Sequence, residues 1–149
     1  MVLNDTSFFD MSLETMNQVL RPKVQGAIVL DELFQDKSLD FFIFFSSITA
    51  IAGNRGQSAY TAANMFMTAL ASQRRKKGLA ASILHICAVV GVGYVNRGFS
   101  ESIFDALRKV GYMRMSERWL RLCFAEAILA SDPRSERGSE VITGVDTTG

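Results

Sequence analysis

The sequence predicts an α/β fold built around a parallel sheet. Two observations support this: helical patterns alternate along the chain with short apolar runs, and those runs are unbroken rather than alternating in polarity. Unbroken apolar runs are typical of strands buried on both faces, and helices are the usual connections between parallel strands. At 149 residues the chain corresponds to one domain at most.

The first predicted helix is capped by Ser12 and continues through apolar residues at helical spacing, which are Met16, Leu20, Val24 and Ile28. Pro22 lies inside this series, so the pattern is compatible with a short helix, a kink and a longer helix. The aromatic and β-branched run over 41–45 predicts a strand buried on both faces. Two glycines and several small polar residues then predict a loop over 46–57.

A second helix is predicted over 58–77, since cations in its last turn and Gly78 after it match a helix C-terminus. The cationic end is predicted to be solvated. The remaining predicted elements, in chain order, are a strand over 79–90 that Gly91–Gly93 ends, helices over 100–110 and 116–130, a polar connector over 131–139 and a short strand over 140–145. His85 is predicted to be a satisfied core histidine, and Trp119, Leu122 and Cys123 are predicted to be core.

Composition excludes several classes of function. The formal net charge is +1, whereas a nucleic-acid-binding domain normally shows a basic excess. One histidine and two distant cysteines predict reduced thiols and no metal site. The longest apolar stretch, 41–45, is too short to span a membrane, and no signal-peptide core follows Met1. We therefore expect a cytoplasmic protein that binds neither nucleic acid nor membrane.

Polar side chains interrupt the helix over 58–77, which is otherwise apolar on nearly every side. Tyr60 and Asn64 are spaced i, i+4, so both project from one face near its start. Ser47 ends the preceding strand, and strand C-terminal ends face the ligand crevice of a parallel sheet. Taken singly, Tyr60 is better explained as a satisfied core tyrosine and Ser47 as the start of a turn.

Together these residues suggest carbonyl reduction by hydride from a dinucleotide. The developing alkoxide needs a proton donor and a second hydrogen bond. Because the ordinary pKa of tyrosine is about 10, a nearby ammonium group is needed to lower it.

Four residues match the ketoreductase domains of polyketide synthases, which are short-chain dehydrogenases, in identity and spacing: Lys23, Ser47, Tyr60 and Asn64. In most short-chain dehydrogenases the lysine follows the tyrosine by four positions. In these ketoreductases asparagine takes that place and the lysine comes from an upstream helix, as here. The flanking segments 1–5, 44–47, 53–57 and 91–94 also resemble fungal highly reducing synthases and synthase–peptide-synthetase hybrids.

The resemblance implies a truncated Rossmann-like fold: the C-terminal half, with about three parallel strands and flanking helices. The chain is then a single partial ketoreductase domain over 1–149, without the nucleotide-binding half. No Gly-x-Gly-x-x-Gly motif opens a helix after a strand, which agrees with that expectation. The strand over 41–45 is expected at an uncovered sheet edge, favouring self-association or a partner that supplies the nucleotide-binding half.

The resemblance also implies roles, with NADPH as cofactor. Tyr60 protonates the carbonyl oxygen and Ser47 donates a hydrogen bond to it. Lys23 lowers the pKa of Tyr60, and both are expected to contact the cofactor, Lys23 at the nicotinamide ribose. Asn64 orders a water or the lysine.

A marker of stereochemistry is also implied. Asp5 ends a Leu-Asn-Asp sequence where one stereochemical class carries Leu-Asp-Asp, and Ala52 stands where the opposite class carries tryptophan. The alternative is that Asp5 caps a turn.

The function implied is NADPH-dependent, stereoselective reduction of a small-molecule ketone to a secondary alcohol in fungal polyketide or meroterpenoid biosynthesis. A stand-alone keto-reductase of the fumagillin kind is one expectation within this class. The alternative is a non-catalytic ketoreductase remnant or a docking module of a polyketide synthase.

Overall fold

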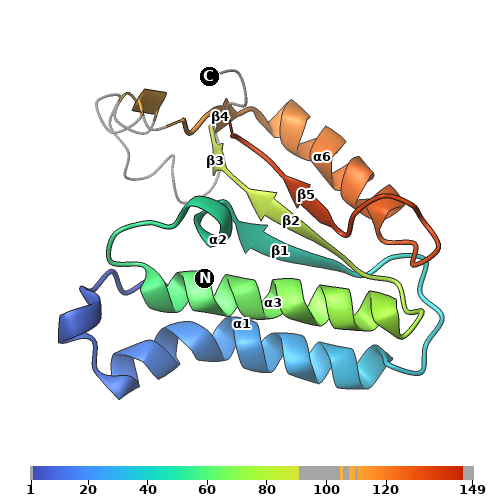
Figure 1. Ribbon diagram of the computed structural model, residues 1–149, viewed down its shortest axis with the longest axis horizontal. Coiled ribbons are helices and arrows are strands. Elements are labelled where there is room, and N and C mark those ends of the chain that lie inside the picture. The colour runs from blue at the N-terminus through green and yellow to red at the C-terminus, as the bar shows by residue number, and fades with distance from the viewer. Residues whose placement is uncertain (1, 91–104, 106–107, 110, 146–149) are drawn as a thin grey trace.

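A three-stranded parallel sheet lies between two helical layers in the computed structural model, which describes residues 2–90, 105, 108–109 and 111–145 (Figure 1). The strands are β1 (Ile43–Ser47), β2 (Ser82–Ile86) and β5 (Glu140–Ile142), in the order β1-β2-β5. Both pairings are parallel, as predicted. Among the described residues β1 pairs only with β2 and therefore forms an edge of the sheet.

Helix α1 (Leu13–Phe34) begins as predicted, since the Ser12 side chain accepts a hydrogen bond from the Thr15 backbone nitrogen at 3.1 Å. The helix is continuous through Pro22 and is not divided there. Proline removes the hydrogen bond to the Gln18 carbonyl. Pro22 and Gln18 are both exposed, so water can solvate that carbonyl and the helix continues.

Helix α3 (Ser58–Lys76) lies beside α1 on the same face of the sheet (Figure 1). It ends at Lys77 and Gly78, whose φ of 75° is the left-handed conformation that glycine tolerates best. The short helix α2 (Thr49–Ala52) forms inside the segment predicted to be a loop. The core under α1 and α3 consists of Ala27, Phe44, Met67, Leu70, Ala71, Ala81 and Ile83.

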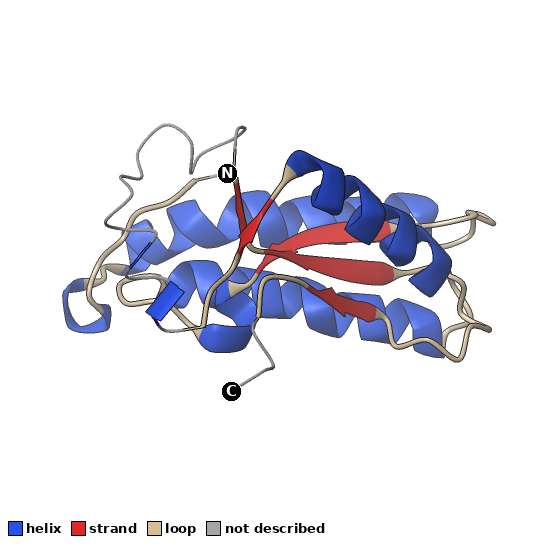
Figure 2. Cartoon of the chain, turned by 90° about the horizontal axis from the view of Figure 1, so that it is seen from above, coloured by secondary structure: helices blue, strands red, loops and turns tan. Residues whose placement is uncertain are grey.

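The other face of the sheet is covered by α6 (Glu117–Ala130), which Ser116 caps at its start (Figure 2). The predicted strand over 79–90 is divided into β2 and β3 (Ala88–Val89). β3 pairs in parallel with β4 (Arg114–Met115), a strand that the sequence pattern did not predict. A 3-10 helix, η1 (Phe8–Asp10), precedes α1. The glycines at 91–93 and most of the predicted helix over 100–110 lie outside the described residues.

The prediction that 41–45 is buried on both faces is wrong. Phe44 is 5% exposed and faces the α1/α3 core, whereas Phe41 and Phe45 are 45% and 48% exposed. Phe45 stacks on Phe124 of α6 at 5.9 Å between ring centroids, but α6 lies mainly over β2 and β5. One helix therefore leaves the edge strand partly uncovered.

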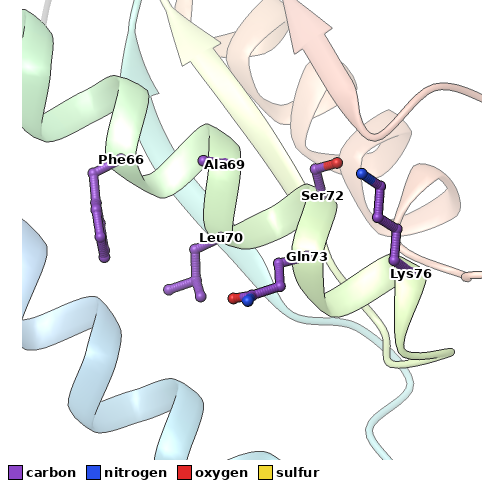
Figure 3. A pocket seen from close by; sticks show the side chains of 6 residues that line it. All are labelled: Phe66, Ala69, Leu70, Ser72, Gln73 and Lys76. Carbon is purple, nitrogen blue, oxygen red and sulfur yellow. The ribbon is translucent and has the colours of Figure 1, made fainter.

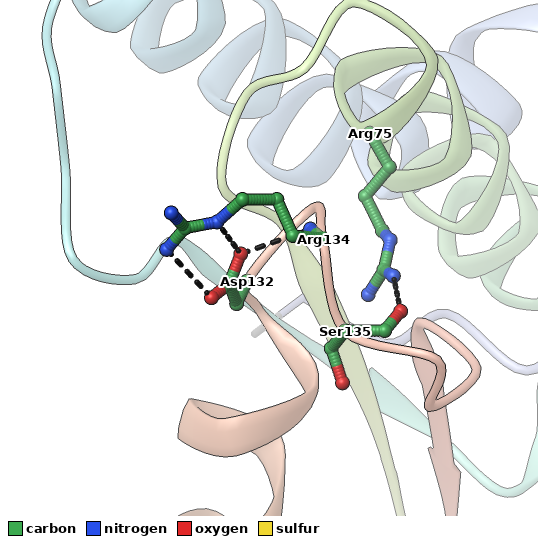
Figure 4. A network of polar contacts seen from close by, with 4 residues as sticks. All are labelled: Arg75, Asp132, Arg134 and Ser135. Atoms are coloured by element: carbon green, nitrogen blue, oxygen red, sulfur yellow. Dashed lines mark hydrogen bonds and ion pairs between the residues drawn. The ribbon is translucent and has the colours of Figure 1, made fainter.

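Two arginines at the end of α3 are bound rather than solvated, so that prediction is also wrong for them. Arg74 is 1% exposed and forms an ion pair with Asp31 of α1 at 2.6 Å. Arg75 donates to the backbone carbonyl of Ala130, the last residue of α6, and at 2.9 Å to that of Ser135 in the connector after it (Figure 4). These contacts join α3 to α1 on its own side of the sheet and to the end of α6 on the other side.

Within the part of the chain that the structure describes, no helix combines the length and the apolar character needed to cross a membrane.

Candidate active site

Tyr60 lies in the first turn of α3, near the C-terminal end of β1. A helix that returns from a parallel strand starts at the end where the strand finishes, and this topology brings Tyr60 toward Ser47. The Tyr60 side chain is 8% exposed and packs with Val19 and Ala59. A phenol is thus held in an apolar setting at the crevice end of the sheet.

Lys23 reaches this position from α1. Its Nζ lies over the Tyr60 ring, 5.5 Å from the ring centroid, and donates to the Phe45 carbonyl oxygen at 2.9 Å. Burial lowers the pKa of Lys23 from 10.5 to about 8. The amine therefore has a cation–π contact with the tyrosine and is also bonded to the edge strand.

Ser47 is the last residue of β1. Its Oγ accepts a hydrogen bond from the Thr49 backbone nitrogen at 3.3 Å, which occupies one lone pair. A hydrogen bond between the Ser47 side chain and Tyr60 lowers the pKa of the phenol.

Asn64 follows Tyr60 by one helical turn and is fully buried. Its Nδ2 donates to the Tyr60 backbone carbonyl at 2.8 Å. Its Oδ1 has no hydrogen-bond partner among the described residues. A buried amide oxygen without a protein partner is well suited to accept from an ordered water, which is one of the two roles expected for Asn64.

The pKa of Tyr60 is raised, not lowered, and this differs from the role expected of Lys23. Burial is the largest cause and outweighs the hydrogen bonds with Asn64 and Ser47, which act in the opposite direction. The physical reason is that Lys23 is itself partly desolvated and meets the ring face. The four residues are brought together, but the net environment favours the neutral phenol.

Asp5 contacts a residue that sequence reasoning did not single out. Both carboxylate oxygens of Asp5 accept from Gln57 Nε2 at 3.1 Å, and the Thr6 backbone nitrogen donates to the Gly56 carbonyl at 2.9 Å. Gln57 precedes Tyr60 by three positions. That spacing from the tyrosine, immediately before the helix, is the signal that could have identified it.

A shallow hollow lies farther along α3, toward its C-terminal end, and is lined by Phe66, Ala69, Leu70, Ser72, Gln73 and Lys76 (Figure 3). Figure 3 shows Phe66, Leu70 and Gln73 projecting toward α1. None of the four candidate catalytic residues lines this hollow, so we do not assign it to the site. Among the described residues, no group of three or more His, Cys, Asp and Glu side chains gathers where a metal could bind.

A family model described as "KR domain" matches residues 1–91, which include Asp5 and all four candidate catalytic residues. The chain belongs to the KR domain family. The matched residues make up more than half of the chain. Solved ketoreductase structures, given below, share its Rossmann-like fold with parallel strands.

Similar proteins include hybrid PKS-NRPS synthetases of fungi. The chain is 70% identical over 146 residues to xenE of Xenoacremonium sinensis, covering 98% of this chain and 4% of that protein. It is 69% identical to pydA of an Acremonium species and to gkaA of Penicillium citrinum, with 99% of this chain and 4% of each relative covered. The KR chain therefore spans a small part of the curated relatives it matches.

Solved ketoreductases share the fold. PlmKR1, the ketoreductase from the first module of phoslactomycin biosynthesis in Streptomyces sp. HK803, is 31% identical with a TM-score of 0.81, over 98% of this chain and 32% of that one. An A-type ketoreductase structure from a modular polyketide synthase is 27% identical with a TM-score of 0.82, over 97% of this chain and 29% of that one.

Proposed function

We propose that this KR chain supplies the catalytic groups for NADPH-dependent, stereoselective reduction of a small-molecule ketone to a secondary alcohol in fungal secondary metabolism. One observation supports this above all: Lys23, Ser47 and Asn64 come from α1, β1 and α3 and all contact Tyr60. Ketone reduction is what membership of the KR family implies, and the cofactor, stereoselectivity and pathway are our proposal.

Tyr60 is the proton donor. Since burial raises the pKa of Tyr60 above its ordinary value of 10.0, the phenol is protonated at neutral pH and can donate to a carbonyl oxygen that becomes an alkoxide. Ser47 donates the second hydrogen bond: the Thr49 N–H engages one lone pair of its Oγ, and the hydroxyl proton, directed at Tyr60 in the free chain, turns to the substrate oxygen when substrate binds. Asn64 holds a water that can reprotonate the phenol after each turnover.

The residues around Tyr60 fit one end of NADPH. Lys23 has three N–H donors and uses one on the Phe45 carbonyl, so the others suit the hydroxyls of a nicotinamide ribose. When bound, NADPH supplies the hydride that reduces the carbonyl carbon. Residues 1–149 contain no glycine-rich phosphate loop, so in this proposal the groups that hold the phosphates lie outside these residues.

We propose that strands from outside residues 1–149 pair with the open edge of β1. β1 has one hydrogen-bonded neighbour among the described strands, and Phe45 is half exposed beside its open edge. Unpaired strand edges readily pair with another strand. The partner is either strands that supply a nucleotide-binding half or a second copy of this chain. Concentration-dependent light scattering with an NADPH titration tests this, and a monomer that binds NADPH tightly would contradict it.

A non-catalytic remnant or docking module is the second candidate. The observation that favours it is the bond from Lys23 to the edge-strand carbonyl, which gives the lysine a structural function independent of any cofactor. Lysine at a sheet edge is a common protection against unwanted strand pairing.

NADPH oxidation with a panel of ketones, measured for the purified chain alone and with an added ketoreductase nucleotide-binding half, separates the two candidates. We expect oxidation and a single alcohol enantiomer in the complemented sample. Absence of turnover despite formation of the complex would favour the non-catalytic module. The relatives named above are hybrid synthetases, so we place the substrate on a polyketide–peptide pathway; a fumagillin-type stand-alone reductase and a cytoplasmic location stay predictions.

A further inference from the structure

The connection between β1 and α3, residues 48–57, joins Ser47 to Tyr60. A site residue therefore lies on each side of this connection, and the shape of the connection affects where the hydroxyls of Ser47 and Tyr60 lie relative to each other. Inside it, Thr49 is bonded to Ser47 through its backbone nitrogen and to Thr61 through its carbonyl, each at 3.3 Å. Bonds within the connection, from the Ala52 nitrogen to the Ile48 carbonyl and from the Gln57 nitrogen to the Asn54 carbonyl, shape it on either side of Gly53, and Gln57 is bonded from outside by Asp5. Tyr112 contacts the turn between these two parts.

The turn at Gly53 is held by hydrogen bonds and not by packing. Its backbone adopts φ 73° and ψ 170°, and a Cβ built there would meet nothing within 4 Å. The Gly53 nitrogen donates to the Thr49 carbonyl at 2.9 Å, which closes α2. The Gly53 carbonyl accepts from the Tyr112 hydroxyl at 2.8 Å.

Tyr112 makes that contact from a distant part of the chain. It lies 59 positions after Gly53 and outside the residues 1–91 that the family model matches. Its ring is partly buried against a cluster of Ile48, Cys87 and Met115, so the hydroxyl extends from an anchored side chain. An anchored donor costs little further side-chain entropy when it holds a turn.

We propose that Tyr112 is a positioning residue of the Tyr60 site: its hydroxyl holds the 48–57 connection at Gly53 and thereby keeps Ser47 within hydrogen-bonding distance of Tyr60. The hydrogen bond from the Tyr112 hydroxyl to the Gly53 carbonyl is present in the structure whatever reaction the site performs. Its consequence for catalysis rests on the proposed ketone reduction. Tyr112 touches neither substrate nor cofactor in this proposal and acts through Ser47.

Tyr112→Phe tests the proposal, because it deletes the hydroxyl and keeps the ring that packs in the cluster. The chain has 3 tyrosines, so a sample labelled with ¹³C at tyrosine Cζ gives few signals, and the variant itself identifies that of Tyr112. The Cζ shift reports hydrogen bonding of the phenol. We expect the Tyr60 signal to move in the variant, toward the position of a phenol that has lost its bond to Ser47.

Ser82→Ala is the matched control. It removes another buried hydroxyl-to-carbonyl bond, from Ser82 Oγ to the Ala127 carbonyl at 2.7 Å, which joins β2 to α6 and not the connection. We expect the Tyr60 signal to stay in place in this control. In the complemented enzyme, Tyr112→Phe should lower kcat about threefold to tenfold with KM little changed, as expected for one hydrogen bond made in the transition state, and Ser82→Ala should not.

An unmoved Tyr60 signal in Tyr112→Phe would overturn the proposal. Equal movement in both variants would also overturn it, since general loosening would then explain the effect. Movement confined to Tyr112→Phe in a protein without reductase activity would uphold the positioning role and refute the proposed function.

Discussion

On one face of the sheet α3 packs over β1 and β2 and against α1, and Met67 and Ala71 of α3 and Phe44 of β1 are at most 5% exposed. On the other face α6 lies alone, and its Trp119, Leu122 and Leu129 are 53–62% exposed. All four candidate catalytic residues belong to the first face or to the end of β1. A site of this kind requires rigid, well-packed support, and only the two-helix face supplies it.

Trp119, Leu122 and Leu129 form an exposed stripe on α6, and this stripe corrects a prediction. Helical spacing placed Trp119 and Leu122 in a core, and the structure exposes both. The buried residues of α6 are Ala127 and Ala130, at 0% and 2% exposed, and Phe124 on the same helix stacks on Phe45 of β1. Periodicity identified the helix but not which of its faces is buried.

Tyr60→Phe, a change on the two-helix face of the sheet, should have the largest effect on activity. It removes one hydroxyl from the two-helix face, so we expect ketone reduction to fall by about 10²-fold or more, as for loss of a general acid, with little change in circular dichroism. NADPH oxidation by the complemented protein is the measurement. Unchanged turnover would mean that the proton comes from elsewhere.

Paired truncations compare the two faces directly. Met67→Ala removes a buried side chain from the α1/α3 core and should lower the free energy of unfolding by about 2–4 kcal/mol. Leu122→Ala removes a side chain that is 53% exposed and should cost less than about 1 kcal/mol. Urea unfolding followed by circular dichroism measures both. Equal costs would show that the α6 stripe is covered in solution, for example by a second copy.

Lys23→Met should have the smallest effect, on the pH dependence of stability. In the folded chain the pKa of Lys23 is about 8 and in the unfolded chain it is near 10.5, so the unfolded state binds more protons between these values. The burial cost of the charged amine is fully present below pH 8 and is relieved as pH rises toward 10.

The quantity to measure is the free energy of unfolding of the parent minus that of the variant, from pH 7 to 10. We expect it to rise with pH above 8. Taking the difference cancels the thiols of Cys87 and Cys123, whose raised pKa values lower stability as pH increases through that range. Lys37→Met, on an exposed turn, is the control. A flat difference would contradict burial of the Lys23 amine.

Much of the fold followed from local pattern. Ser12 and Ser116 cap α1 and α6 as their residue types predict, and Gly78 ends α3 in the left-handed conformation. The short α2 and β4 were missed, because elements of four and two residues contain too little periodicity to recognise. His85 was placed correctly in the core, where Nε2 is 3.0 Å from Glu140, although Nδ1 has no partner among the described residues.

The candidate site shows the same division between sequence and structure. Spacing and residue identity were enough to select Lys23, Ser47, Tyr60 and Asn64, since the family motif is a property of sequence. Tertiary structure alone decided that Gln57 bonds Asp5, that Tyr112 holds Gly53 and that burial raises the pKa of Tyr60. The physical reason is that sequence specifies which groups are available, whereas desolvation and long-range hydrogen bonds depend on which distant segments pack around them.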